Sequence, residues 1–312
     1  MPQIGHLVNY FWAQMIFDTD PPPLLGEALG PAGEKRSLHI LQAADKIEPA
    51  YYRETWGDER AGKNMKAALN MWKNTRMIIL VAVCAAIYGA ALIAFKTAIP
   101  FIPGITELRV ANIFPMVFGL VFGPAGAWGT AIGNLLGDLF GGTLGPASIA
   151  GFVGNFLLGY LPYAMWTRLV PFAEKSPEWK AGSWRSRMNY FFIAFVSSAA
   201  CAVIISTFVD ALGIVPYAIL TKIITLNNTL ASWIGVVLLV AVFGVTRDQF
   251  GLFWVDIMDE KDIGKPVAGI LGAWLVTVAS VVGLLGGMAT GLSAPTVGWI
   301  STLVILIGSL LL

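Results

Sequence analysis

The fold is decided by residues 107–138, which read ELRVANIFPMVFGLVFGPAGAWGTAIGNLLGD. Two apolar segments, residues 110–122 and 124–141, flank the tight turn that Gly123-Pro124-Ala125-Gly126 predicts. Both are shorter than the roughly 20 apolar residues that a helix needs to cross a bilayer. Short, glycine-broken spans are tolerated in a membrane only where protein or water surrounds them. The stretch therefore predicts helices that pack inside a membrane domain.

The composition of the whole chain also indicates a membrane protein. Of its 312 residues, 56% are hydrophobic and 12% are charged, whereas soluble domains carry about 25% charged residues. The mean hydropathy is +0.71. These values exclude an ordinary soluble globule. The net charge of +1 supplies no basic field that would attract nucleic acid.

The chain lacks the residue patterns of metal, redox and hydrolytic sites. Cys84 and Cys201 lie in separate apolar runs, and the two histidines, His6 and His39, lie in the polar N-terminal part. We find no phosphate-binding loop, serine nucleophile elbow or H-E-x-x-H motif. We therefore expect no metal, no cofactor, no enzymatic activity and no ATP hydrolysis by this chain.

The hydropathy pattern predicts an all-α, polytopic membrane protein. A polar tail (residues 1–76) precedes six predicted helices in residues 77–246. Residues 247–312 hold a cytoplasmic loop and two additional helices, which are the most uniformly apolar and look appended to the first six. The eight predicted spans are 77–98, 110–122, 124–141, 147–167, 189–212, 229–246, 267–287 and 295–312.

Positive charges predict the orientation of these helices. The segments before the first span, between the fourth and fifth spans and between the sixth and seventh spans together carry 13 Lys and Arg residues. The opposite side carries three: Lys96, Arg109 and Lys222. Because Lys and Arg accumulate in cytoplasmic loops, we expect both termini to be cytoplasmic in a multi-pass cell-membrane protein. Residues 59–75, which mix charged and apolar side chains, predict a surface helix that leads into the first span.

Six polar side chains converge on the outer half of the predicted membrane domain. Asn134 and Asp138 are four residues apart and share one helix face. Polar groups at this depth are costly, and ionisable ones generally face a cavity and mark a function. An alternative is that Arg109 and Asp138 form a buried ion pair that pins helices together. Asp210 is either a seventh member or a solvated helix end. The six candidate residues are Glu107, Arg109, Asn112, Asn134, Asp138 and Asn155.

Small residues also recur at helical spacing. Gly129, Gly133 and Gly137 are typical of a helix face that another backbone approaches closely. A second stripe lies on the first predicted helix and suits either docking of another membrane protein or packing inside the chain's own bundle; spacing alone favours the second interpretation. The second stripe consists of Ala82, Ala86, Ala90 and Ala94.

We interpret Asn227-Asn228-Thr229 as a chance glycosylation sequon, and the acidic run from Asp256 to Asp262 as a solvated loop.

These motifs resemble the substrate-binding S components of energy-coupling factor (ECF) transporters, particularly the group associated with uptake of queuosine precursors. The resemblance covers roughly residues 77–246 and is strongest over 102–166. The residues that carry it are Glu107-Leu108-Arg109, the turn Phe122-Gly123-Pro124-Ala125-Gly126-Ala127-Trp128, the run Ile132-Gly133-Asn134-Leu135-Leu136-Gly137-Asp138 and the alanine stripe.

The resemblance implies a six-helix substrate-binding unit whose pocket opens to the outside under the loop between the first two helices. It also implies a transmembrane coupling subunit and two cytoplasmic ATPases as partners. In such units a small-residue stripe on the first helix contacts the coupling subunit. The resemblance therefore assigns this docking role to Ala82, Ala86 and Ala90, in place of the packing inside the bundle that spacing alone favours. The 76-residue tail and the two extra spans depart from the pattern.

The leading hypothesis is therefore the substrate-capture subunit of an importer for a small water-soluble micronutrient, a vitamin or a queuosine precursor, energised by ATPases on other chains. Arg109 would anchor an acidic or carbonyl group of the ligand, Asp138 and Glu107 would accept hydrogen bonds, and the three asparagines would orient it. The alternatives are a solitary transporter or facilitator and a non-transporting membrane scaffold. Membrane lipid is a partner in each case.

Overall fold

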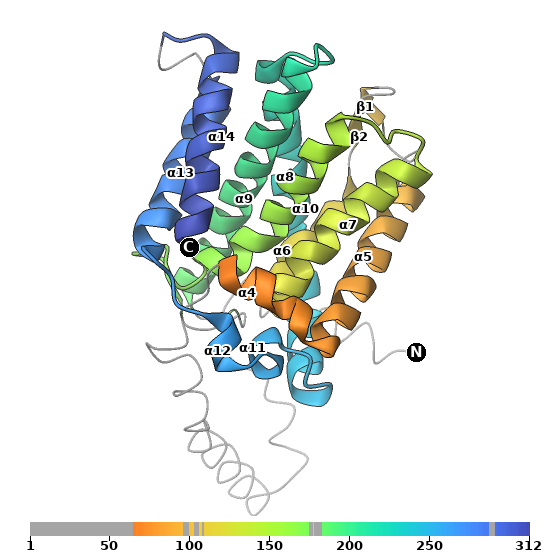
Figure 1. The fold of residues 1–312 in the computed structure, drawn as a ribbon, viewed down its shortest axis with the longest axis vertical. Helices are drawn as coiled ribbons and strands as arrows, with labels where there is room; N and C mark the ends of the chain where they lie inside the picture. Colours follow the sequence, from red (N-terminus) through yellow and green to blue (C-terminus); the bar gives the residue numbers. More distant parts are fainter. Residues whose placement is uncertain are drawn as a thin grey trace, which may run out of the picture.

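A computed structural model describes residues 65–95, 100–102, 106–107, 109–174, 177, 183–286 and 291–312. The described chain is a bundle of long helices, which confirms the all-α prediction, with one short antiparallel pair of strands at one end (Figure 1). The strands are β1 (Pro100–Ile102) and β2 (Thr106–Glu107). Most of the predicted tail, residues 1–64, lies outside the described residues.

A helix lies at each of the eight predicted segments. Four helical stretches are long and apolar enough to cross a membrane by length and composition: Thr75–Phe95, Trp184–Ala211, Tyr217–Ile257 and Ala294–Leu311. The division into six spans plus two remains a prediction. The main helices are α5 (Thr75–Phe95), α6 (Ile113–Phe122), α7 (Pro124–Phe140), α8 (Ala147–Met165), α9 (Trp184–Ala211), α10 (Tyr217–Gly244), α13 (Gly269–Leu285) and α14 (Ala294–Leu311).

The start of α10 corrects one predicted boundary. The sixth span was expected at 229–246, but the helix begins at Tyr217. Thr221, Thr225 and Asn228 lower the hydropathy of the added turns, yet all three are buried against neighbouring helices. A polar helix face is stable when protein rather than lipid covers it, so the hydropathy criterion missed this part of the helix.

Glycine allows α5 and α7 to lie in backbone contact. A Cβ atom added to Gly133 would lie 3.0 Å from the carbonyl oxygen of Ala85 and 3.1 Å from the amide nitrogen of Gly89. At Gly129 it would meet the Cβ atom of Cys84 at 2.3 Å. The spacing of these glycines predicted such an approach, and the structure confirms it.

Two short segments that are far apart in sequence meet at one end of the bundle (Figure 1). The first consists of α4 (Met65–Asn70) and a 3₁₀ turn (Met71–Lys73), and the second of α11 (Trp254–Ile257) and α12 (Glu260–Ile263). The side-chain amide of Asn70 donates to the carbonyl oxygen of Asp262 (3.4 Å), and that of Asn74 to Ile257 (3.1 Å). We call residues 65–74 and 254–263 the inner joint, and this end of the bundle the inner end, after the predicted orientation.

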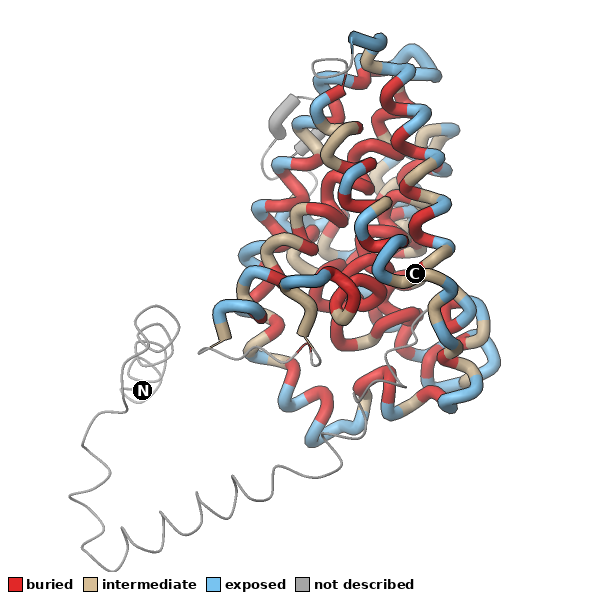
Figure 2. The backbone as a smooth tube through the Cα atoms, turned by 90° about the vertical axis from the view of Figure 1, so that its left-hand side faces the viewer, coloured by how far each residue is buried: buried red, intermediate tan, exposed pale blue. Residues whose placement is uncertain are grey.

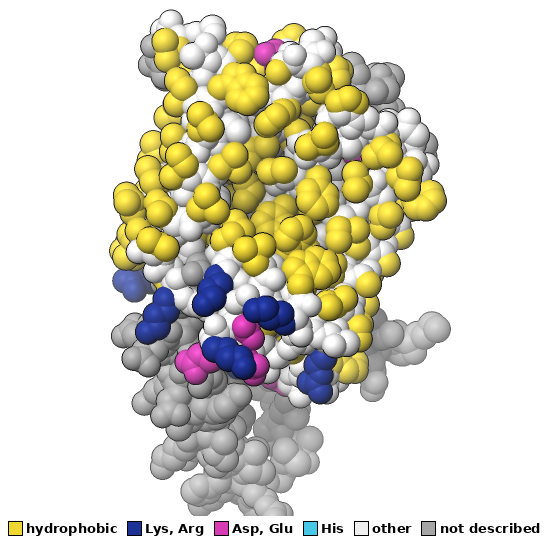
Figure 3. Space-filling view, in the orientation of Figure 1, with side chains coloured by type: hydrophobic (Ala, Val, Ile, Leu, Met, Phe, Trp, Pro, Cys, Tyr) yellow, Lys and Arg dark blue, Asp and Glu magenta, His cyan; other side chains and the backbone are white. Residues whose placement is uncertain are grey.

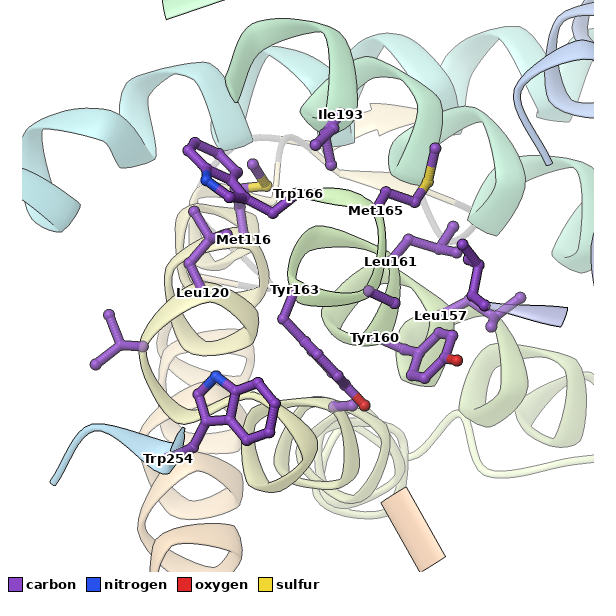
Figure 4. Packing of buried hydrophobic residues seen from close by; sticks show 14 of the residues in the cluster. Met116, Leu120, Leu157, Tyr160, Leu161, Tyr163, Met165, Trp166, Ile193 and Trp254 are labelled. Atoms are coloured by element: carbon purple, nitrogen blue, oxygen red, sulfur yellow. The ribbon is translucent and has the colours of Figure 1, made fainter. Parts of the chain in front are cut away.

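Aromatic side chains fix the inner joint to the helices above it. The indole nitrogen of Trp128 donates to the carbonyl oxygen of Ala68 (2.8 Å), and its ring meets the edge of Trp72 at 5.5 Å. Trp254 is fully buried against Tyr163, with ring centroids 5.2 Å apart (Figure 4). A Cβ atom at Gly123, where φ is +52°, would lie 2.4 Å from the Trp254 ring. The turn at Gly123 and Pro124 therefore also leaves the space into which the Trp254 ring packs.

The loop that contains α11 and α12 is partly folded and partly solvated. Phe253 and Trp254, which precede the acidic run, are buried. Asp256, Asp259 and Glu260 are exposed, and Asp259 forms an exposed ion pair with Lys261 at 3.6 Å, as expected of a solvated acidic run.

The surface of the bundle carries the expected separation of apolar and charged groups. A broad apolar band covers the face shown in Figure 3, and Lys and Arg side chains gather below it towards the inner end. The buried faces of the helices point towards each other along the bundle (Figure 2). Arg168, just beyond α8, is buried, and this burial lowers the pKa of its guanidinium to about 10.

Candidate functional site

Five of the six predicted site residues have described side chains, and these come from the loop and 3₁₀ turn before α6 and from α7 and α8. Arg109 precedes a 3₁₀ turn (Val110–Asn112) that leads into α6. Asn112, Asn134 and Asn155 are buried, whereas Arg109 and Asp138 are half-buried. Glu107 ends β2, and its side chain lies outside the described part of the chain. The structure thus places neutral amides deep and the charged groups nearer the edge.

Asn134 lies between the two charged residues. The Arg109 guanidinium donates to Asn134 Oδ1 (3.4 Å), and Asn134 Nδ2 donates to Asp138 Oδ2 (3.4 Å). A Cβ atom at Gly151 of α8 would lie 2.9 Å from Asn134 Nδ2, so the glycine makes room for this amide. The contacts connect Arg109 and Asp138 through an amide, whereas the ion-pair alternative placed them in direct contact.

Tyr88 of α5 is a central member of the cluster that sequence reasoning missed. Its hydroxyl lies 2.7 Å from Asn112 Oδ1 and 2.9 Å from Asn155 Oδ1. Asn155 Nδ2 donates to the carbonyl oxygen of Gly151 (2.8 Å), which fixes the orientation of that amide. One hydroxyl carries one hydrogen and donates to one oxygen at a time. The pair of amide oxygens therefore has capacity for a further donor.

Two asparagines of α10, Asn227 and Asn228, complete the cluster, and both are buried. The backbone amide of Arg109 donates to Asn227 Oδ1 (3.1 Å), and Asn112 Nδ2 donates to Asn228 Oδ1. Asn228 Nδ2 in turn reaches Cys201 Sγ at 3.6 Å. The sequence contains a signal for these two residues, because two adjacent asparagines stand in an otherwise apolar segment. Both were missed because they precede residue 229, the predicted start of the helix.

Asp210 and Trp128 do not belong to the cluster. Asp210 Oδ1 accepts a hydrogen bond from the backbone amide of Tyr217 (2.9 Å), so it satisfies the first turn of α10. Trp128 lies at the inner end of the bundle, where its indole donates to the carbonyl oxygen of Ala68. Asp210 therefore stabilises the connection between α9 and α10.

The alanine stripe faces away from the bundle. Ala82, Ala86 and Ala90 are exposed, whereas Cys84, Tyr88 and other residues of the opposite face of α5 are buried. The structure therefore excludes packing of this stripe inside the described bundle. It leaves the stripe on an exposed apolar face of α5, next to the exposed side chains of Val83 and Ile87.

The cluster has the chemistry of a recognition site for a polar small molecule. Amides and hydroxyls both donate and accept hydrogen bonds, while Arg109 and Asp138 add one charge of each sign. Among the described residues, no group of three His, Cys, Asp or Glu side chains is arranged to hold a metal ion. The site residues with described side chains are Tyr88, Arg109, Asn112, Asn134, Asp138, Asn155, Asn227 and Asn228.

The fold and the cluster together define an all-α membrane protein with a polar cluster between its helices. The model of the QueT transporter family matches residues 78–244, more than half of the 312 residues. The chain belongs to this family, and it is a membrane transporter protein. Among curated proteins and among solved structures, no match is found.

Proposed function

We propose that the chain is the substrate-capture component of an ECF-type importer for a queuosine precursor or another small micronutrient. One observation carries this proposal: all the polar side chains of the cluster fall within the family-matched residues 78–244. The additional segments lie outside that range, at the inner joint and in α13 and α14. The family-matched part of the chain thus contains the whole cluster.

The cluster suits a planar ligand that is rich in hydrogen-bond donors. Asp138 and the amide oxygens near Tyr88 accept hydrogen bonds from ring N–H or amino groups, and Arg109 donates to a carbonyl or acidic group. Nucleobase-like compounds present such groups on their edges. Glu107, at the end of β2, would add a further acceptor from the loop above the site.

Ligand titration of the purified full-length chain tests the site. We expect one of a panel of labelled 7-deazapurine bases and vitamins to bind, and Arg109→Ala and Asp138→Ala each to weaken binding by about tenfold or more, because each removes a charge-assisted hydrogen bond. Asp259→Ala, which removes an exposed carboxylate of the inner joint, is the control and should bind normally. Normal binding by correctly folded Arg109 and Asp138 variants would show that the site is assigned wrongly.

The energy source is a separate part of the proposal. We propose that a coupling subunit docks on Ala82, Ala86 and Ala90 and connects the chain to two cytoplasmic ATPases, since these alanines form an exposed small-residue surface. Uptake by vesicles that contain this chain alone should be absent and should appear when the ATPase module is added with ATP. Uptake without any ATPase would instead establish a solitary transporter.

A further inference from the structure

The buried face of α10 continues beyond the amide cluster as a row of polar side chains. Thr221, Thr225, Asn228, Thr229 and Ser232 recur at intervals that place them on one side of the helix, and all five are buried. Asn228 belongs to the cluster through Asn112 and Cys201. Thr225 and Thr229, each within one turn of Asn228, therefore adjoin the cluster.

These two threonines belong to a group of buried hydroxyls without a hydrogen-bond partner among the described residues, which also includes Ser206 of α9 and Ser280 of α13. Thr225 and Thr229 are the two of this group that lie on α10, within one turn of Asn228. A hydroxyl inside an apolar helix normally donates to the carbonyl oxygen one turn earlier. Thr221 does so at 2.8 Å and Thr207 of α9 at 2.7 Å. The hydroxyls of Thr225 and Thr229 have no hydrogen-bond partner among the described residues, although both side chains are more than nine-tenths buried.

A buried hydroxyl without a partner is unfavourable and requires an explanation, and a bound molecule that pairs with it is one such explanation. We propose that Thr225 and Thr229 form a second subsite, which binds a neutral ligand group that both donates and accepts hydrogen bonds, such as an alcohol or the edge of a cyclic amide. Within this face of α10 there is no charged side chain, and Lys222 is exposed, which is why the group is neutral. The inference rests on the proposed function, because it extends the same ligand site.

Isosteric substitutions test the subsite with 7-deazaguanine, whose ring carries a cyclic amide, as the probe. In the full-length chain, Thr225→Val and Thr229→Val retain the shape of the side chain and remove the hydroxyl, so each should weaken binding by about tenfold. Thr225→Ser restores the hydroxyl and should bind within about threefold of the unchanged chain. Thr221→Val is the matched control on the same helix face, and its affinity should not change, since the Thr221 hydroxyl is occupied by the Tyr217 carbonyl.

The outcomes separate this inference from the proposed function. If 7-deazaguanine binds and Asp138→Ala abolishes binding while both valine variants bind normally, the subsite is refuted and the proposed function stands. An equal loss in Thr221→Val, Thr225→Val and Thr229→Val would indicate a general packing effect and would also refute it. If the unchanged chain binds none of the deazapurines or vitamins, the proposed function fails and the subsite fails with it.

Discussion

The Tyr88 hydroxyl joins α5 to Asn112, in the 3₁₀ turn before α6, and to Asn155 of α8. Tyr88→Phe removes it and leaves the amide oxygens of Asn112 and Asn155 without this donor. Because buried acceptors that lose a partner are unfavourable, we expect a loss of about 1–3 kcal/mol in the free energy of unfolding. Ligand affinity should fall as well, since the two amides lose their fixed orientation. Thermal unfolding in detergent and ligand titration measure the two effects.

Tyr160→Phe is the control for this prediction. The Tyr160 hydroxyl is equally buried but donates to the backbone carbonyl of Ser309 in α14 (3.0 Å), outside the cluster. Its removal should lower the unfolding temperature and leave ligand affinity unchanged. Equal loss of affinity in the two variants would mean that Tyr88 acts only through stability.

At the level of single residues, the sequence predicts five of the polar members of the cluster and misses Tyr88, Asn227 and Asn228. Arg109, Asn134 and Asn155 were recognisable because a polar side chain in an apolar run is costly. Tyr88 was not, because a tyrosine in a membrane helix also suits the apolar interior or the interface. Asn228 was hidden because its helix was predicted to start at residue 229.

Among the helices, the contact between α5 and α7 leaves no room for a side chain at Gly133. Gly133→Ala would bring a Cβ atom within 3.0 Å of one backbone oxygen and 3.1 Å of one backbone nitrogen. Because backbone atoms cannot rotate away, the helices must separate, and we expect a loss of about 1–3 kcal/mol in unfolding free energy. Gly145→Ala, whose nearest neighbour would be 4.0 Å away, is the control for thermal unfolding. Equal stability of the two variants would contradict close packing of α5 on α7.

The opposite face of α5 gives a prediction about docking. Ala86→Leu combined with Ala90→Leu adds bulk to the exposed stripe and should abolish co-purification with the proposed coupling subunit, because close helix approach requires small side chains. Ligand binding should persist, since the stripe faces away from the cluster. Ala241→Leu adds the same group to an exposed position of α10 and should co-purify normally. Normal co-purification of the double variant would remove the stripe from the proposed interface.

The helix boundaries show which elements the sequence can predict. Gly123-Pro124 ends α6 and begins α7 where predicted, because proline at the first helical turn and glycine at positive φ are strong local signals. The first turns of α10 lack such signals and carry threonines and asparagines. Their stability comes from packing on other helices, which no local pattern reports.

At the scale of the whole molecule, the segments before and after the family-matched range meet at the inner joint. Their hydrogen bonds connect residues 183 and 192 positions apart. The sequence predicted a surface helix over residues 59–75 but contained no signal for its partner. Trp254 was equally unpredictable, because its burial depends on the space that Gly123 leaves. The structure therefore shows that these two additions form one unit beneath α7.

Asn74 holds this unit through two separable contacts. Its Oδ1 accepts from the backbone amides of Arg76 (3.0 Å) and Met77 (3.3 Å) at the start of α5, and its Nδ2 donates to the carbonyl oxygen of Ile257 (3.1 Å). Asn74→Ala removes both contacts and should lower the unfolding free energy by about 1–2 kcal/mol, the usual effect of losing a helix cap. Asn74→Asp keeps the acceptor and removes the donor, so α5 should stay stable while residues 254–263 exchange backbone hydrogens faster. Hydrogen–deuterium exchange with mass spectrometry measures that difference. Unchanged exchange in the Asp variant would mean that the aromatic contacts of Trp254 and Trp128 hold the inner joint without Asn74, and that its role is confined to α5.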